Sequence, residues 1–292
     1  MEIKKETGHF DSFDGTPIYY EVRGEGQPLV LVYGIACLMN HWSHQISYFS
    51  TQFKVITFDI RGHHKSNPVS NLKHLKLEHI AEDIHLLLKY LNIQRAHFAG
   101  HSFGVPSLVE FSGKYPNEVL SMSLINGFAK NPLLGGKGNE WLTPIYHMIR
   151  AQYEMNPDIW NTVWRLAVDN PISMYLAALA GGFNINLTHF KDIEIYARGV
   201  ARMDLRIFIT MFEEVLAFDG EYILDTINFP VLIIAGEKDN ITPISFQKTM
   251  HDKIKDSEFV LVPYGSHCTQ LDFPDYINLK IKDFLQRNSS QV

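Results

Sequence analysis

Six nearly unbroken apolar stretches recur along the chain. Each is bounded by turn-forming or polar residues, and they cover positions 29–33, 53–58, 96–99, 119–125, 231–235 and 257–262. A short stretch of this kind, rich in branched side chains, is typical of a strand that is buried on both faces. A hairpin is predicted before them, between residues 9 and 23, with its turn at Asp14 and Gly15. The pattern therefore predicts a sheet that is mostly parallel.

Apolar residues at helical spacing fill several of the intervals between these stretches. The clearest set repeats every three or four positions: Leu77, Ile80, Ala81, Ile84, Leu87, Leu88 and Leu91. Alternating strands and helices predict an α/β fold with a doubly wound sheet and right-handed crossovers. In such sheets ligands bind beyond the carboxyl ends of the strands. We therefore expect functional residues directly after strands.

The alternation stops between residues 129 and 229, which contain helical stretches and no convincing strand. We predict that residues 1–128 and 230–292 form the α/β core and that residues 129–229 form an inserted helical cap, or lid. Most of the many aromatic and sulfur-containing side chains in this segment are assigned to its own core. A cap above the strand ends also needs apolar side chains that face a ligand. We expect Trp141 and Trp164 to be among them.

Composition limits the class of protein. The 292 residues carry a formal net charge of −6, with 46% hydrophobic and 20% charged residues, which is ordinary for a globular enzyme and gives no footprint for nucleic acid. The two cysteines, Cys37 and Cys268, are too few for a disulfide framework. The first residues lack an apolar signal core, and no stretch of about 18 apolar residues occurs. We expect a cytoplasmic protein without a membrane span.

Three residues suited to nucleophilic catalysis each follow a predicted strand. Ser102 has glycines two positions before and after it, which leave room for a sharp strand-to-helix turn that exposes its hydroxyl. A serine needs a base within hydrogen-bond distance and an acid that orients the base. His267 and Asp239 follow the last two predicted strands and are the predicted base and acid. Glu237 is the nearest competitor for the role of the acid.

Attack on a carbonyl produces an oxyanion, which must be met by hydrogen-bond donors already in place. The backbone N–H of Phe103 is one predicted donor, because it lies at the start of a helix, where partial positive charge gathers. The second is predicted in the loop after residues 29–33, where Gly34 lets the backbone approach closely, and Ile35 N–H is our choice. We also expect the neighbouring Tyr33 and His101 to contact the substrate.

With these motifs the sequence resembles the α/β-hydrolase family over nearly its whole length. Beside the serine, aspartate and histidine segments, the resemblance rests on Gly34 with Trp42 and Gln45, and on the segment 58–66. It implies an eight-stranded sheet with a helical lid, and a serine hydrolase that needs no cofactor. The implied substrate is a small carboxylic ester or lactone with an apolar acyl part. Within the segment 58–66 the resemblance implies scaffold roles for Asp59, Arg61 and Ser66.

The chain departs from the family pattern at several positions. Tyr33 stands where the family usually has a histidine, and Val105 stands where it often has a second glycine. His64 and Lys65 replace a common pair made of a glycine and a variable residue. None of these departures removes the serine, the aspartate or the histidine.

Other functions stay open at this point. The same three residues could hydrolyse a carbon–carbon bond in a β-diketone or dienoate, or the fold could act as a slow-turnover receptor that passes lid movement to a partner. The adjacent His63 and His64 invite a metal site. However, neighbouring side chains in a loop point apart, and no ligand spacing accompanies them. We therefore predict no bound metal.

Overall fold

A single eight-stranded sheet forms the centre of the molecule. The computed structural model describes residues 4–134, 142–170, 172–173, 175 and 182–289. The strands are β1 (Lys5–Asp11), β2 (Pro17–Arg23), β3 (Gln27–Val32), β4 (Phe53–Phe58), β5 (Ala96–His101), β6 (Val119–Ile125), β7 (Val231–Gly236) and β8 (Ser257–Val262). Their order in the sheet is β1-β2-β4-β3-β5-β6-β7-β8. The strands from β3 onward are parallel, whereas β1 and β2 pair antiparallel.

The order of the strands follows from the burial pattern. All six residues of β5 and of β7 and all seven of β6 are buried, as expected for strands covered on both faces. The strand β1 lies at the edge and is largely exposed. The six predicted apolar stretches correspond to the six parallel strands, and the predicted hairpin corresponds to β1 and β2. The prediction of an eight-stranded, mostly parallel α/β fold is thus confirmed.

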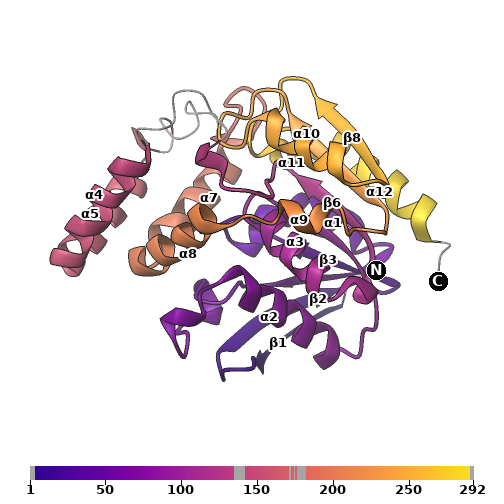
Figure 1. Ribbon diagram of the computed structural model, residues 1–292, viewed down its shortest axis with the longest axis horizontal. Helices are drawn as coiled ribbons and strands as arrows, with labels where there is room; N and C mark the ends of the chain where they lie inside the picture. The colour runs from indigo at the N-terminus through magenta and orange to yellow at the C-terminus, as the bar shows by residue number, and fades with distance from the viewer. Residues whose placement is uncertain (1–3, 135–141, 171, 174, 176–181, 290–292) are drawn as a thin grey trace.

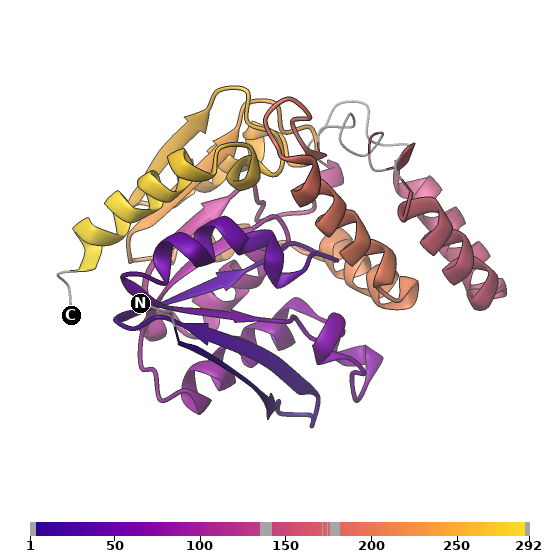
Figure 2. The same cartoon turned by 180° about the vertical axis from the view of Figure 1, so that it is seen from behind.

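Helices cover both faces of this sheet (Figures 1 and 2). One face carries α2 (Leu77–Tyr90), α3 (Gly104–Lys114), α9 (Glu221–Leu224) and α10 (Ile244–Lys253), and the other carries α1 (Ser43–Phe49), α11 (Thr269–Asp272) and α12 (Pro274–Asn288). Short 3-10 helices are η1 (Met39–Trp42), η2 (His64–Ser66), η3 (Leu72–His74), η4 (Pro116–Glu118) and η5 (Pro132–Leu134). Helices on both faces keep water away from the central strands.

A helical region is inserted between β6 and β7. It contains α4 (Leu142–Met155), α5 (Pro157–Val168), α7 (Phe190–Arg202) and α8 (Leu205–Ala217), which gather at one end of the sheet, on the left of Figure 1. Tyr153, Leu205 and Ile209 form a small apolar cluster of their own within this region. The segment predicted as the cap also contains α9, which packs against α3 at Gly113.

The turn after β4 is fixed by a buried ion pair. Arg61 is fully buried and donates from Nε and Nη2 to the carboxylate of Asp83, at 2.7 and 2.6 Å. Ser66 donates to the Asp59 carbonyl at 2.7 Å. These contacts agree with the scaffold roles implied for this segment. Among the described residues, no helix is both long enough and apolar enough to cross a bilayer.

Candidate active site

Ser102 lies in the sharp turn between β5 and α3. Its φ is +53°, which is left-handed backbone that a residue other than glycine rarely adopts. A Cβ on Gly104 would lie 2.3 Å from the carbonyl oxygen of Val32, and one on Gly100 would lie 2.8 Å from Leu108. Glycine is therefore required at position 104, where the clash is with backbone of β3, whereas a Cβ at position 100 would need Leu108 of α3 to shift. The sequence motif predicted this turn for the same steric reason.

The structure brings the three predicted catalytic side chains together. His267 Nε2 lies 2.9 Å from Ser102 Oγ, and His267 Nδ1 lies 3.0 Å from Asp239 Oδ2. Both distances are hydrogen-bond lengths. Since the Asp239 carboxylate accepts the proton on Nδ1, the lone pair on Nε2 faces the serine. This is the tautomer that a general base requires.

The carboxylate of Asp239 is held by its own loop. Oδ1 accepts from the N–H groups of Ile241 and Thr242, both at 2.8 Å, and Oδ2 accepts from the Thr242 hydroxyl at 2.7 Å. These bonds fix the rotamer that reaches His267. Glu237, the competing acid, is exposed and accepts instead from the N–H of Tyr264. Asp239 is therefore the acid that the geometry selects.

The two predicted oxyanion donors lie on loops that adjoin Ser102. The N–H groups of Ile35 and Phe103 have no hydrogen-bond acceptor among the described residues. A Cβ on Gly34 would lie 3.1 Å from the Cβ of Ser102, so the loop after β3 passes directly beside the serine. The N–H of Ala36 is already used, since it donates to His63 Nε2 at 3.0 Å. The N–H of Ile35 is thus free to act as the predicted donor of this loop.

Tyr33 connects this loop to the turn after β4. Its hydroxyl donates to Asp59 Oδ1 at 3.2 Å and accepts from the N–H of Ile60 at 2.9 Å. The side chain is fully buried, and burial raises the pKa of this phenol well above its ordinary value. These contacts place Tyr33 between β3 and the turn after β4, whereas we had predicted a substrate contact.

His101 is also buried and has two partners of its own. Its Nε2 lies 2.8 Å from the carbonyl oxygen of His267, and its Nδ1 lies 3.1 Å from His41 Nε2. Because a carbonyl can only accept, His101 carries its proton on Nε2 and accepts at Nδ1 from His41. Burial keeps both rings neutral by lowering the pKa of His41 to about 3 and that of His101 well below its ordinary value. His101 therefore holds the backbone of the predicted base.

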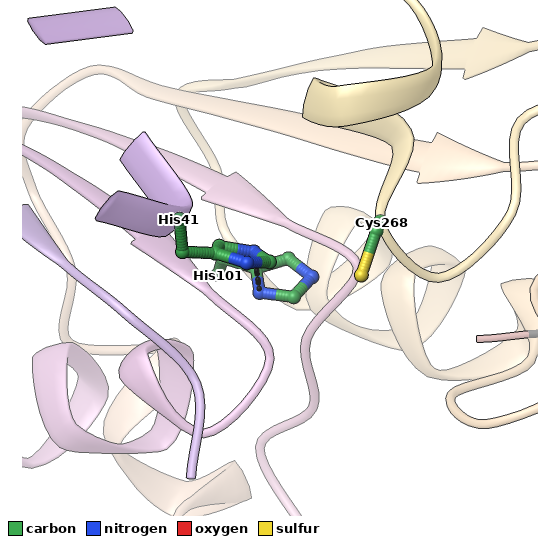
Figure 3. A group of neighbouring side chains, drawn as sticks. All are labelled: His41, His101 and Cys268. Atoms are coloured by element: carbon green, nitrogen blue, oxygen red, sulfur yellow. Dashed lines mark hydrogen bonds between the residues drawn. The ribbon is translucent and has the colours of Figure 1, made fainter. Parts of the chain in front are cut away.

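Cys268 completes a group of potential metal ligands with these two histidines (Figure 3). The ligand atoms of the three residues lie within 4.8 Å of one another. A metal would need a lone pair on His41 Nε2, which here donates its proton, and a thiolate on Cys268. Burial raises the pKa of the Cys268 thiol well above its ordinary value. Hydrogen bonds account for both ring nitrogens of His101, whereas Nδ1 of His41 is buried without a partner among the described residues. The buried, neutral thiol and the proton on His41 Nε2 make this donor set unfavourable for a cation.

Asn126 is a buried residue of the site that the sequence analysis missed. It directly follows β6, with φ at +45°. Its Nδ2 lies 2.7 and 2.6 Å from the carbonyl oxygens of Ser266 and His267, and its Oδ1 accepts from the N–H of Gly236 at 2.8 Å. The Thr242 hydroxyl, which donates its single proton to Asp239 Oδ2, also lies 2.8 Å from the carbonyl oxygen of Asn126. One side chain and its backbone thus join the aspartate loop to the histidine loop.

An apolar cavity of about 420 Å³ adjoins the oxyanion loop. It is lined by Ile35 and Ala36 from that loop and by Trp164, Phe183, Ala197, Val200 and Phe208 from the inserted region, among others. Trp164 thus lies where the sequence analysis expected it. Trp141, the other predicted pocket residue, lies outside the described residues. None of the described residues that line the cavity carries a charge.

Comparison with known proteins agrees with this geometry. The family model described as the alpha/beta hydrolase fold matches residues 27–274. The chain belongs to the α/β-hydrolase family. The match spans the elements that carry Ser102, Asp239 and His267. This resemblance was predicted from the sequence motifs and is confirmed.

Individual relatives of this α/β hydrolase are distant. One relative is RutD of Caulobacter sp. (strain K31), which is named as a carbamate hydrolase. It is 23% identical over 279 residues, which is 92% of this chain and 95% of the relative. The esterase EaEST of Exiguobacterium antarcticum superposes with a TM-score of 0.80 at 18% identity, covering 96% of this chain and 100% of the esterase. The meta-cleavage product hydrolase of Pseudomonas fluorescens IP01 gives 0.76 at 18% identity, covering 96% and 97%. At such low identity these structures show the fold alone.

The first prediction for this α/β hydrolase concerns Asn126. In Asn126→Asp the carboxylate can still accept from Gly236, but it places a second acceptor against the carbonyls of Ser266 and His267. We expect kcat/KM for an ester substrate to fall by about 100-fold, because a small shift of a catalytic group costs that much. Asn131→Asp is the matched control, since Asn131 is a buried asparagine whose Nδ2 donates to Leu216. Equal activity losses in the two variants would contradict the specific role of Asn126.

The second prediction concerns acid stability. Burial lowers the pKa of His41 and His63 to about 3 and that of His97 to about 4, and it lowers the pKa of His101 well below its ordinary value. Below about pH 6.5 the histidines of the unfolded chain bind protons, whereas the buried histidines of the native chain stay neutral. The free energy of unfolding therefore decreases as the pH is lowered. Each histidine contributes about 1.4 kcal/mol per pH unit between roughly pH 6 and 4.

Urea unfolding between pH 8 and pH 5 measures this effect. We expect a nearly constant free energy of unfolding above pH 7 and a steep fall below pH 6. His97→Gln should reduce the dependence of the free energy of unfolding on pH in the acid range by about one bound proton, because it removes one of the four buried imidazoles whose pKa is lowered. An unchanged free energy of unfolding between pH 7 and pH 5 would show that these rings are protonated in the native state.

Proposed function

We propose that this protein is a serine hydrolase that cleaves a small carboxylic ester or lactone with an apolar acyl part. The observation that carries the proposal is the continuous hydrogen-bonded chain from Ser102 Oγ through His267 to Asp239, at 2.9 and 3.0 Å, beside two free backbone N–H groups. A hydroxyl, a base, an orienting acid and an oxyanion site together are what acyl transfer requires.

Acylation would begin with attack by Ser102 on the substrate carbonyl. As the O–C bond forms, His267 Nε2 takes the hydroxyl proton, and the carbonyl oxygen becomes an oxyanion. The N–H groups of Ile35 and Phe103 stabilise this negative charge, while Asp239 stabilises the imidazolium. The bond to the leaving alkoxide then breaks, and His267 donates the proton to it. An acyl-enzyme and an alcohol result.

Deacylation would use the same groups with water in place of the serine. His267 takes a proton from water, the hydroxide adds to the acyl carbonyl, and the proton returns to Ser102 as the ester bond breaks. A lactone follows the same course, except that its alcohol remains attached to the acyl group until water releases the hydroxy acid. The described residues supply each proton transfer without a further group.

The cavity favours a neutral acyl group over a charged one. Its described lining residues are apolar or uncharged, and Ile35 belongs to both the cavity and the proposed oxyanion site. A dienoate, the substrate of the carbon–carbon alternative, carries a carboxylate that would lose hydration here without gaining a cationic partner. An esterase and a meta-cleavage product hydrolase share this fold, so the fold is compatible with both reactions and does not choose between them.

The third prediction tests the nucleophile. A fluorophosphonate probe should label the native protein at a single residue. Ser102→Ala should abolish both labelling and ester turnover, because among the described residues only the Ser102 hydroxyl contacts His267 Nε2, whereas Thr242 contacts Nδ1. Intact-protein mass spectrometry measures the label. Undiminished labelling of Ser102→Ala would show that another residue is the nucleophile. Cleavage of a β-diketone with negligible ester turnover would instead favour the carbon–carbon alternative.

The fourth prediction tests the acyl cavity. Ala197 lines the cavity and is largely buried, so Ala197→Phe should fill part of the space meant for the acyl chain. We expect kcat/KM for octanoyl or decanoyl esters to fall at least 10-fold, since each buried methylene is worth about 0.8 kcal/mol. Acetyl esters serve as the internal control and should change by less than about threefold. Equal losses for short and long esters would place the acyl chain elsewhere.

A further inference from the structure

His64 adopts a backbone conformation that suits glycine. Its φ is +40°, in the 3-10 helix η2 that follows β4. A β-carbon in left-handed backbone clashes with the adjoining peptide, so a histidine here destabilises the turn relative to glycine. Such strain persists where the surrounding structure imposes it, and it gathers at functional sites. The side chain of His64 therefore needs an explanation.

The imidazole of His64 reaches the oxyanion loop. Its Nε2 lies 2.8 Å from the carbonyl oxygen of Cys37. Because a carbonyl only accepts, the imidazole donates this bond. The ring is half-buried, and it joins the turn after β4 to the loop after β3 across 27 positions of sequence. The bond is thus a tertiary contact and not a local turn closure.

His63, the residue before His64, bonds the same loop at Ala36, the residue before Cys37. Its Nε2 accepts from the N–H of Ala36 at 3.0 Å, and its Nδ1 lies 3.3 Å from the carbonyl oxygen of Arg61, to which it can donate. Burial lowers the pKa of His63 to about 3, so the ring stays neutral and keeps the lone pair that Ala36 needs. Two adjacent histidines therefore hold two adjacent residues of the loop.

The held loop is a tight turn that presents Ile35 N–H. The N–H of Cys37 donates to the carbonyl of Gly34 at 3.1 Å, which closes a four-residue turn. Gly34 packs against the Cβ of Ser102, whereas Ala36 is itself left-handed, with φ at +60°. The N–H of Ile35 belongs to the same peptide unit as the Gly34 carbonyl, so a rotation of that unit would break the bond from Cys37 that closes the turn. The bonds to Ala36 and Cys37 oppose that rotation.

We infer that His64 is a positioning residue for the oxyanion donor of Ile35. It accepts an unfavourable backbone conformation in its own turn so that its imidazole can hold the Cys37 carbonyl. This inference rests on the proposed function, since it assigns a purpose to an oxyanion site. The inference predicts opposite effects on stability and on activity: glycine at position 64 should relieve backbone strain and yet lower the rate of catalysis. A residue that only stabilised the turn would not separate these two effects.

The fifth prediction compares His64→Gly with His64→Gln. Glycine removes both the strain and the imidazole, so we expect an unchanged or higher Tm, a kcat that falls about 10-fold or more, and a KM within about threefold. Glutamine keeps an N–H donor of similar reach, and we expect its kcat within about threefold of the native value. Asn92→Gly is the matched control, because Asn92 has φ at +55° in the turn after α2, away from the oxyanion loop. It should leave kcat unchanged.

The decisive measurement is the affinity for a trifluoromethyl ketone, whose hemiketal oxyanion occupies the same site as the reaction's oxyanion. Its Ki for His64→Gly should rise by the factor by which kcat/KM falls, and the rate of fluorophosphonate labelling should fall in parallel. An unchanged Ki or a native kcat in His64→Gly would overturn the inference. So would a His64→Gln variant as impaired as His64→Gly. A native protein that neither labels nor hydrolyses esters would instead refute the proposed function.

Discussion

The left-handed backbone of Ser102 is the constraint on which the site depends. With φ at +53° the serine leaves the line of β5 and stands above the strand ends, where His267 can reach it. The turn packs closely because Gly104 has no β-carbon that would strike the backbone of β3, and Gly100 has none that would press on Leu108 of α3. The same close packing brings Gly34 against the serine and so fixes how near the oxyanion loop can lie. The proposed nucleophile and the proposed oxyanion donor are therefore positioned by one steric arrangement.

The base is fixed through its backbone as well as through its ring. The carbonyl of His267 accepts from His101 Nε2 at 2.8 Å and from Asn126 Nδ2 at 2.6 Å. His101 immediately precedes Ser102, so the nucleophile loop and the base are joined twice, once by each of two neighbouring residues. His101, Asn126 and His267 are buried, so water cannot readily replace a lost partner of this carbonyl. The low local dielectric that strengthens these bonds also makes any rearrangement of the loop costly.

Local sequence pattern was enough to predict the fold and the three central side chains. Each of Ser102, Asp239 and His267 follows an apolar stretch, and parallel strands bring such positions to one edge. Tyr33 also directly follows a strand, yet its side chain points toward Asp59 and not toward the site. The order of residues along the chain does not indicate where a side chain points. Asn126 also follows a strand and could have been noticed for that reason. Its partners, however, lie more than 100 positions away and could not have been deduced.

Cross-loop bonding explains why strain gathers at this edge of the sheet. In the described chain the residues other than glycine with positive φ are Ala36, His64, Asn92, Ser102, Asn126 and Tyr264. All except Asn92 lie in loops after strands, and each bonds a loop that follows a different strand. The pairs are Ala36 with His63, His64 with Cys37, Ser102 with His267, Asn126 with His267, and Tyr264 with Glu237. Asn92 bonds only its own turn, at Lys89. A loop held by its neighbour cannot relax alone, so each unfavourable backbone is maintained by contacts whose own geometry depends on the next loop. The effects of substitutions at these positions on the free energy of unfolding should consequently be non-additive, because the loops at the strand ends are bonded to one another.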